Sequence, residues 1–192
     1  MAEIQIEPAV SARFADLEHI LNGGGDGTSC QCQWWMVRSK DFDATTQGER
    51  ETMLRKEVAA GPPPILLAYV GGAPAAMVRI GPRPAQVRLK HTRAYAQTAR
   101  PDWTDDTIWA VTCFVVRREF RSSGLNASLL DAARDYARAG GAHVVEAYPI
   151  DASSGRKPAD GLFHGVLSTF MRAGFREVAR PKPATAIVEL EV

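Results

Sequence analysis

The residues with the clearest chemical potential form a basic, small-residue turn, Arg121-Ser122-Ser123-Gly124, between two regular patterns. Before the turn, 108–116 is an apolar run rich in Val, Phe, Trp and Thr, which is typical of a buried strand. After it, from Leu125, apolar residues recur with a helical period of 3.6. A strand, a glycine turn and a helix start aim several unpaired N–H groups at one point, where an anion fits. The turn is therefore predicted to hold phosphate, and the strand to guide the rest of a phosphate-bearing ligand.

Two motifs along the chain resemble one known family. Arg121-x-x-Gly124-x-Asn126 resembles the Arg/Gln-x-x-Gly-x-Gly/Ala signature of the GNAT superfamily of acyl-CoA-dependent N-acyltransferases. Further on, the segment 170–175, FMRAGF, resembles the Tyr-x-x-x-Gly-Phe ending of the last helix in that superfamily. A glycine turn at a helix start occurs in many folds, so the turn alone is a weak signal. Two motifs in the right order, separated by one strand and one helix, make a stronger case.

The resemblance implies a binding mode for coenzyme A. In the superfamily, main-chain amides of this turn hold the pyrophosphate, and the pantetheine arm hydrogen-bonds the edge of the preceding strand. One departure is Asn126, where the family prefers Gly or Ala; its side chain either weakens or tunes this binding. Acetyl-CoA is the expected co-substrate, with no metal. The cofactor-binding residues carried over are Phe114, Val115, Val116, Arg121, Ser122, Ser123, Gly124, Leu125, Asn126 and Ala127.

The general acid of many GNAT enzymes cannot be carried over. A tyrosine on the last helix often protonates the leaving thiolate, but this chain has Phe170 at that position. Tyr148, at the end of the expected fifth strand, is the best replacement from the sequence. An ordinary buried strand tyrosine is the alternative, and a CoA thiol also leaves tolerably without help.

Two acidic sites are candidates for work on the acceptor amine, which must lose a proton during attack. Glu146 shares a strand face with Tyr148, and a glutamate in an apolar inner strand is costly to bury unless paired or functional. We expect Glu146 to act as the base; a structural ion pair to an arginine is the alternative. Asp105 and Asp106 precede the central strand as backups, and Asp106 is predicted to bind a cationic acceptor.

An aromatic and sulfur-rich patch follows the first helix. Trp34 and Trp35 are predicted to bind the acceptor substrate, with Cys30 and Cys32 beside them as part of the same wall. Core packing is the alternative for this patch. Cys-x-Cys without a nearby histidine is a weak zinc pattern. Cys113, on the central strand, is either a buried structural residue or a covalent acyl relay.

The elements that position these residues follow an α/β (α+β) pattern. We expect about seven strands in a GNAT-like mixed, mostly antiparallel twisted sheet, flanked by about four helices, in one domain over 1–192. The expected order is β-α-α-β-β-β-α-β-α-β-β, with the fifth strand over 143–150 and the last helix over 162–173. A long irregular segment, 81–106, is expected at the rim of the site.

Bulk composition limits the functional classes. Twenty-three Lys and Arg balance 22 Asp and Glu, giving a net charge of +1, which argues against a nucleic-acid binder. No apolar stretch approaches the roughly 20 residues of a membrane-spanning helix, and the N-terminus lacks a signal-peptide pattern. Three cysteines are an odd number and suggest no disulfide framework. We expect a cytoplasmic protein, and the family resemblance allows a homodimer.

These observations predict an N-acyltransferase that moves an acetyl group from acetyl-CoA to a primary amine of a small molecule, by direct transfer in a ternary complex. Two alternatives stay open. One is an acyl-CoA-binding module without transfer activity, motivated by Asn126 and Phe170. The other is an acetyltransferase whose acceptor is a protein or aminoacyl-tRNA amine.

Overall fold

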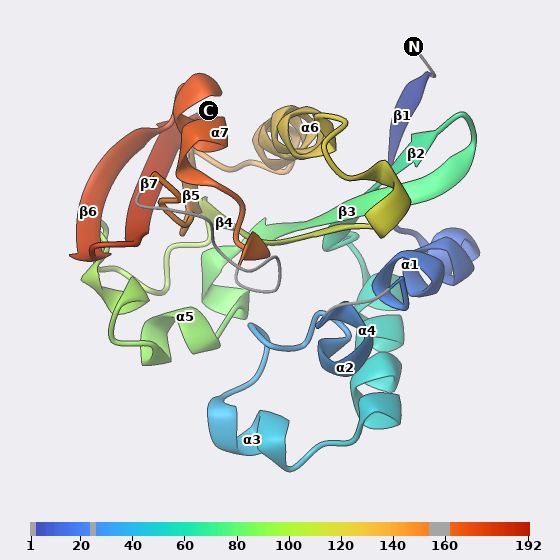
Figure 1. Ribbon diagram of the computed structural model, residues 1–192. Helices are drawn as coiled ribbons and strands as arrows, with labels where there is room; N and C mark the ends of the chain where they lie inside the picture. The colour runs from blue at the N-terminus through green and yellow to red at the C-terminus, as the bar shows by residue number, and fades with distance from the viewer. Residues whose placement is uncertain (1–2, 24–25, 154–161) are drawn as a thin grey trace.

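The computed structural model describes residues 3–23, 26–153 and 162–192. Its centre is a seven-stranded sheet in the order β1-β2-β3-β4-β5-β7-β6 (Figure 1). Neighbouring strands are antiparallel except for the parallel pair β4 and β5. The strands are β1 (Ile4–Pro8), β2 (Ile65–Val70), β3 (Ala73–Pro82), β4 (Ile108–Val116), β5 (Val144–Ala147), β6 (Arg176–Lys182) and β7 (Thr185–Glu191). The predicted fold class and strand number are confirmed.

Four α-helices correspond to those expected from the sequence, and three shorter ones add to them within the described residues. The expected ones are α1 (Phe14–Leu21), α4 (Gln47–Ala60), α6 (Leu125–Ala139) and α7 (Leu167–Arg172). The others are α2 (Gly27–Cys30), α3 (Ser39–Asp43) and α5 (Arg88–His91). Local sequence explains the best-predicted start: Thr46 and Glu49 form a reciprocal capping box at the beginning of α4.

Two predicted boundaries were wrong. The last helix begins at Leu167 rather than residue 162, because Gly165 adopts a left-handed conformation (φ +79°) that a continuous helix does not contain. The fifth strand is also shorter than 143–150. Only Val144–Ala147 pairs on both sides, and beyond it Ile150 makes isolated bridges to Val166 and Thr185.

The sheet is covered on both faces, which explains its apolar inner strands. The helices α6 and α7 lie on one face, while α1, α2 and α4 lie on the other (Figure 1). Leu129 and Leu130 of α6 pack with Val78, Val111 and Val145 in the first core. The second core contains apolar residues of α1 and α4 against β2, β3 and β4, namely Leu17, Ile20, Leu54, Val58, Ile65, Leu67, Met77 and Cys113.

The parallel strands β4 and β5 separate after a short contact. Their pairing runs from Ile108 opposite Val144 to Val111 opposite Ala147 and then stops, although β4 continues to Val116. The chain near residue 163 enters the resulting gap, where the Phe114 N–H donates to the Phe163 carbonyl at 2.7 Å. The second half of β4 therefore has an edge that no neighbouring strand covers.

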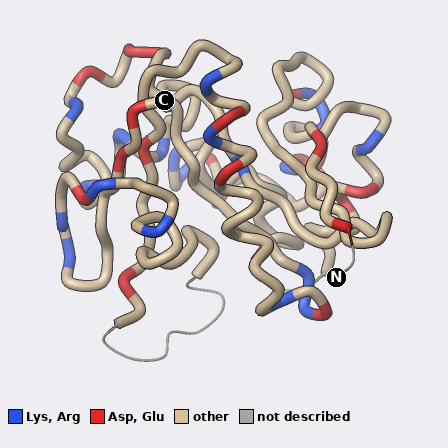
Figure 2. The backbone as a smooth tube through the Cα atoms, turned by 90° about the horizontal axis from the view of Figure 1, so that it is seen from above, with Lys and Arg blue, Asp and Glu red and all other residues tan. Residues whose placement is uncertain are grey.

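Charge is distributed evenly over the molecule. Figure 2 shows basic and acidic residues interspersed around the fold as seen from above.

Among the described residues, none of the helices is long and apolar enough to cross a membrane.

A close approach between α6 and the sheet generates a stability prediction. A Cβ atom on Gly140 would lie 2.5 and 2.6 Å from ring carbons of Trp109, which is 4% exposed. Gly140→Ala should lower the free energy of unfolding by about 1–3 kcal/mol because the buried indole has to shift. Urea unfolding checks this. The control is Gly48→Ala in α4, where nothing lies within 4 Å of the added atom, and its stability should stay equal or rise by up to about 1 kcal/mol. Equal stability of the two variants would contradict the packing argument.

Candidate functional site

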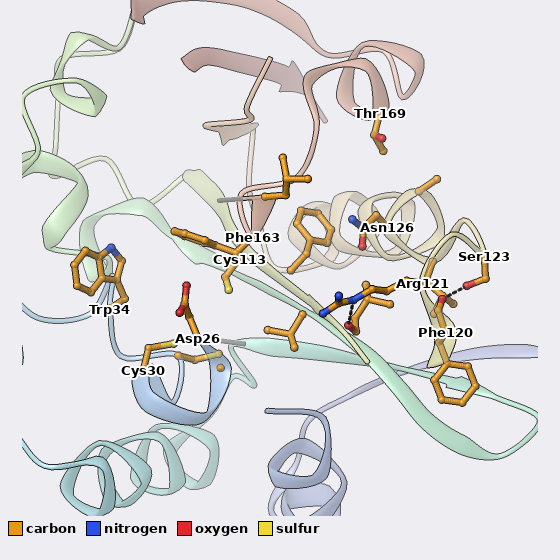
Figure 3. Close-up of a pocket in the computed structure, with 18 of the residues that line it drawn as sticks. Asp26, Cys30, Trp34, Cys113, Phe120, Arg121, Ser123, Asn126, Phe163 and Thr169 are labelled. Atoms are coloured by element: carbon orange, nitrogen blue, oxygen red, sulfur yellow. Dashed lines mark hydrogen bonds between the residues drawn. The ribbon is translucent and has the colours of Figure 1, made fainter. Parts of the chain in front are cut away.

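A cavity of about 940 Å³ opens along the uncovered half of β4. It is bounded by β4, the start of α6, the region around α2 and the approach to α7 (Figure 3). Its lining includes all ten residues predicted to bind the cofactor, together with Trp34 and Trp35. The structure therefore brings together, in one cavity, segments that are more than 80 residues apart in the chain.

The beginning of α6 forms one end of the cavity and has an unusual lack of partners. Gly124 is the N-cap residue with φ +81°, it has no side chain to cap the helix, and the first turn contains no acidic residue. Ser122 is also left-handed, with φ +64°. The main-chain N–H groups of residues 122–126 make no hydrogen bond within the part of the chain that the structure describes. Five amide donors without partners and the positive end of a helix dipole thus lie at the lining of the cavity, where they suit an anion.

Basic side chains also line the cavity. Arg121 lies near the start of α6, and Arg172 comes from α7. Arg117 does not, because its guanidinium donates to Glu119 at 2.8 Å and to the His19 carbonyl at 2.6 Å. Of the arginines near the turn, Arg121 is therefore the better placed counter-charge for a phosphate group.

Asn126 occupies the position where the sequence motif departs from the family pattern. Its side chain is half-buried and lines the cavity, and its Oδ1 is buried without a donor among the described residues. A buried amide oxygen with no partner costs free energy unless a ligand or water donates to it. Asn126 is thus compatible with a ligand that offers an N–H or O–H group at the helix start.

The uncovered edge of β4 offers few free donors. The Arg117 N–H donates to Ala75 on β3, so alternation along the strand directs the Phe114 and Val116 N–H groups toward the open edge. The Phe114 N–H is already bonded to Phe163. The Val116 N–H is therefore the β4 donor on this edge that remains available for a hydrogen bond to an extended ligand.

The opposite end of the cavity is aromatic and sulfur-rich. Trp34, Asp26 and Cys30 lie at this end, and Arg121, Ser123 and Asn126 at the other (Figure 3). Trp34 is 38% exposed, with Arg88 stacked 3.8 Å from its ring and Phe42 at its edge. These contacts hold the indole in place at the cavity wall.

Several lining residues were missed by sequence reasoning. Asp26 is the carboxylate of the aromatic end, and Phe42, Phe120, Thr169 and Arg172 also line the cavity. Asp26 follows a glycine run and carries no motif, so no local signal distinguishes it. Arg172 lies inside the recognisable segment 170–175, which was the available clue.

The two predicted catalytic residues lie elsewhere, in a buried polar network. Glu146 is fully buried and does not line the cavity; it pairs with the buried Arg83 at 3.1 Å and accepts from the hydroxyls of Thr98 and Tyr148. Burial, with the neighbouring Glu146 charge, raises the pKa of Tyr148 well above its ordinary value. Glu146 lies level with Ala110 on β4, about 13 Å along the strand from Phe114. The alternative of a structural ion pair to an arginine fits this geometry.

Asp106 is remote from the cavity, and Phe170 packs behind its lining without being part of it. Asp106 is exposed just before β4, whose length is roughly 30 Å, at the end opposite Val116. Phe170 is fully buried and makes edge contacts with Phe114 and Phe175. The position that often holds a catalytic tyrosine therefore belongs to the core here.

Comparison with known proteins agrees with this geometry. Residues 31–164 match a family model described as the acetyltransferase (GNAT) family. The chain belongs to the GNAT family. A search of curated protein sequences found no match. Family membership supports acyl transfer as the chemistry of this cavity.

Solved structures of GNAT proteins share the fold over almost the whole chain. An acetyltransferase of the GNAT family from Streptococcus pneumoniae is 19% identical, with a TM-score of 0.56 and 99% of both chains covered. PaiA N-acetyltransferase from Thermoplasma acidophilum, in complex with coenzyme A, is 11% identical, with a TM-score of 0.57 and 99% of both chains covered. Ribosomal-protein-alanine N-acetyltransferase from Brucella melitensis is 17% identical, with a TM-score of 0.58 over 98% of this chain and 99% of that one. At these identities the likeness shows the fold alone.

The network around Glu146 allows a test of its role. Glu146→Gln removes the charge opposite Arg83 and should lower the free energy of unfolding by roughly 3 kcal/mol, because a buried guanidinium loses its counter-ion. Chemical denaturation measures this. Glu191→Gln is the control, since that carboxylate is 74% exposed and should change stability little. Unchanged stability of Glu146→Gln, with kcat for acyl transfer strongly reduced, would instead favour the predicted role as a base.

Proposed function

We propose that this chain transfers an acetyl group from acetyl-CoA to a primary amine of a small molecule, by direct transfer in a ternary complex. The observation that carries the proposal is the uncapped start of α6, where five amides without partners among the described residues lie at one end of a large cavity. The family assignment supplies the class of chemistry.

The residues at this end fit coenzyme A. The amides of 122–126 and the Arg121 guanidinium would bind the pyrophosphate, and the Val116 N–H would bind the pantetheine arm as a strand binds its neighbour. Space is available as well, because nothing lies within 4 Å of a Cβ atom built on Gly124. The relative from Thermoplasma acidophilum, which was solved in complex with coenzyme A, supports the donor class by analogy.

The proposed step is a nucleophilic substitution at the thioester. The amine nitrogen forms a bond to the acetyl carbon, the carbon–sulfur bond breaks, and sulfur leaves with the electron pair as CoA thiolate. A thiolate is a tolerable leaving group without prior protonation, so the core position of Phe170 does not prevent the reaction. The amine proton passes to Asp26 or to water in the cavity. Alignment of the two reactants supplies most of the rate enhancement.

The other end of the cavity suits a bounded acceptor. Trp34, Trp35 and Phe42 form apolar walls, and Asp26 provides one carboxylate. Asp26, Arg121 and Arg172 are the charged residues in the described lining. Asp26 is at the aromatic end and Arg121 is at the other (Figure 3). We therefore propose a small amine with an apolar or flat body, whose charged nitrogen is attracted by Asp26.

The setting of the reaction is also proposed. A cytoplasmic location is supported by the three unpaired cysteines, because disulfides characterise oxidising compartments. The family resemblance allows a homodimer, which light scattering of the purified chain would reveal.

The decisive experiment combines two measurements on the purified chain. Isothermal titration with CoA should show saturable binding, and a thiol-release assay with acetyl-CoA should show turnover with at least one member of a primary-amine panel. Binding without turnover on any small amine, peptide N-terminus or aminoacyl-tRNA would favour an acyl-CoA-binding module. The absence of CoA binding would refute the proposal.

Gly124→Glu tests the anion site directly. The added carboxylate would stand beside the proposed pyrophosphate, so the KM for acetyl-CoA should rise at least about tenfold, the equivalent of 1.4 kcal/mol. Gly72→Glu is a matched control, because Gly72 in the β2–β3 turn has φ +82° and equally open surroundings. Backbone strain is thus the same in both variants. An unchanged KM in Gly124→Glu, or an equal rise in both, would contradict the assignment.

Asp26→Asn tests the acceptor end. Loss of this charge should raise the KM for a cationic amine by about tenfold, while the KM for acetyl-CoA should change less than about twofold, because the opposite end binds the donor. Steady-state kinetics with each substrate varied in turn separates the two effects. Asp41→Asn, an exposed substitution outside the cavity lining, serves as the control. An equal effect on both KM values would show that Asp26 supports the whole cavity.

A further inference from the structure

Three cysteines from two distant parts of the chain meet at the wall of the cavity. Cys30, Cys32 and Cys113 all line it, and all are free thiols. Cys32 and Cys113 pack in one buried cluster with Met77 of β3, whose sulfur lies 3.7 Å from the Cys32 sulfur. Cys32 and Cys113 are only 2% and 6% exposed, and the exposed part borders the cavity.

A buried arginine lies beside this pair. Arg79 of β3 is the register partner of Cys113 on β4, so the two side chains are on the same face of the sheet. Arg79 is 2% exposed and forms an ion pair with Glu57 of α4. Its Nε and Nη1 are buried and have no partner among the described residues. Two unpaired N–H groups of a buried cation next to sulfur atoms would stabilise negative charge there.

Backbone conformation and electrostatics distinguish Cys32 from the other two thiols. Gln31 and Cys32 are consecutive non-glycine residues in the left-handed region, with φ of 46° and 56°, and this rare conformation turns Cys32 inward. The hydrogen bond from Cys113 and the charge of Arg79 lower the pKa of Cys32, against burial and Glu57. Hydrogen bonding to Cys32 and burial raise the pKa of Cys113, and burial raises that of Cys30 to about 12. Cys32 is therefore the thiol of the group whose ionisation its surroundings favour.

We propose that Cys32 and Cys113 form a peroxide-reactive dithiol, in which Cys32 attacks and Cys113 resolves. The Cys32 thiolate attacks one oxygen of a hydroperoxide, the O–O bond breaks, and Cys32 becomes a sulfenic acid while hydroxide or alkoxide leaves. The Cys113 sulfur then forms the S–S bond and displaces the sulfenic oxygen as water. For hydrogen peroxide, two thiols and one H₂O₂ give one disulfide and two H₂O.

The disulfide would connect the segment that carries Trp34 to β4. Cys32 precedes Trp34 by two residues, so the bond would anchor the aromatic end of the cavity to the sheet. Nothing in this chemistry depends on acyl transfer.

The test is peptide mapping of the folded chain after treatment with hydrogen peroxide, under non-reducing conditions and without any CoA compound. The expected product is a Cys32–Cys113 linkage that thiol reductant reverses. Cys113→Ser should instead accumulate a Cys32 sulfenic acid that dimedone traps, and Cys30→Ser should form the linkage at an unchanged rate. A linkage through Cys30, or oxidation of Cys30 with Cys32 left reduced, would overturn the proposal.

The role of Arg79 is tested by a charge-neutral double variant. Arg79→Gln with Glu57→Gln removes both partners of the ion pair, so no lone buried charge remains. Its sulfenic acid should form about tenfold more slowly, the change expected for a one-unit rise in the pKa of the Cys32 thiol. A second measurement is the rate at which iodoacetamide alkylates each cysteine of the original chain as a function of pH. Cys32 should react at lower pH than Cys30, and the reverse order would overturn the proposal.

Discussion

The separation of β4 from β5 after Val111 is the constraint on which the rest of the site depends. If β4 and β5 stayed paired along their whole length, the backbone groups on their facing edges would hydrogen-bond each other. No ligand could then bind between the two strands. Because the pairing stops, the second half of β4 keeps an exposed edge at the place where α6 begins. The cavity, the free amides and the thiol group all lie along this edge. The entry of Phe163 limits it, since one of the strand amides is already bonded there.

The cavity is electrically asymmetric, and this asymmetry explains how one site could hold two reactants. A helix N-terminus without a capping side chain and with unpaired amides attracts an anion by up to about 1–2 kcal/mol in a partly buried setting. Arg121 adds to this attraction, whereas Asp26 provides negative charge at the far end. In the proposed function, such an arrangement would orient a long ligand with a phosphate at one end and leave the other end for a cationic partner. The proposed reaction would then need few specialised catalytic groups.

Buried charge has two different uses in this protein. Arg83 pairs with Glu146, and hydroxyls and carbonyls add further bonds, so these side chains order the long segment between β3 and β4. Among the described residues only Nε of the Arg83 guanidinium lacks a partner. Arg79 has two such nitrogens, Nε and Nη1, and it lies beside Cys113. The ion pair with Arg83 gives one buried acid, Glu146, a structural setting although its residue type and strand position predicted catalysis.

The sequence by itself determined the fold class, the sheet with its flanking helices, and the glycine turn before α6. Local periodicity and small residues at fixed spacing mark these elements, and the resemblance to a known family supplied their arrangement. It also brought Trp34 into consideration as part of a wall. Only the tertiary structure decided which acidic side chain reaches the cavity. Alternation along β5 shows the face on which Glu146 lies, but not the arginine 63 residues away that pairs with it. Likewise, the meeting of Cys32, Cys113 and Arg79 depends on strand register and on a left-handed loop, and neither property is visible in a single sequence.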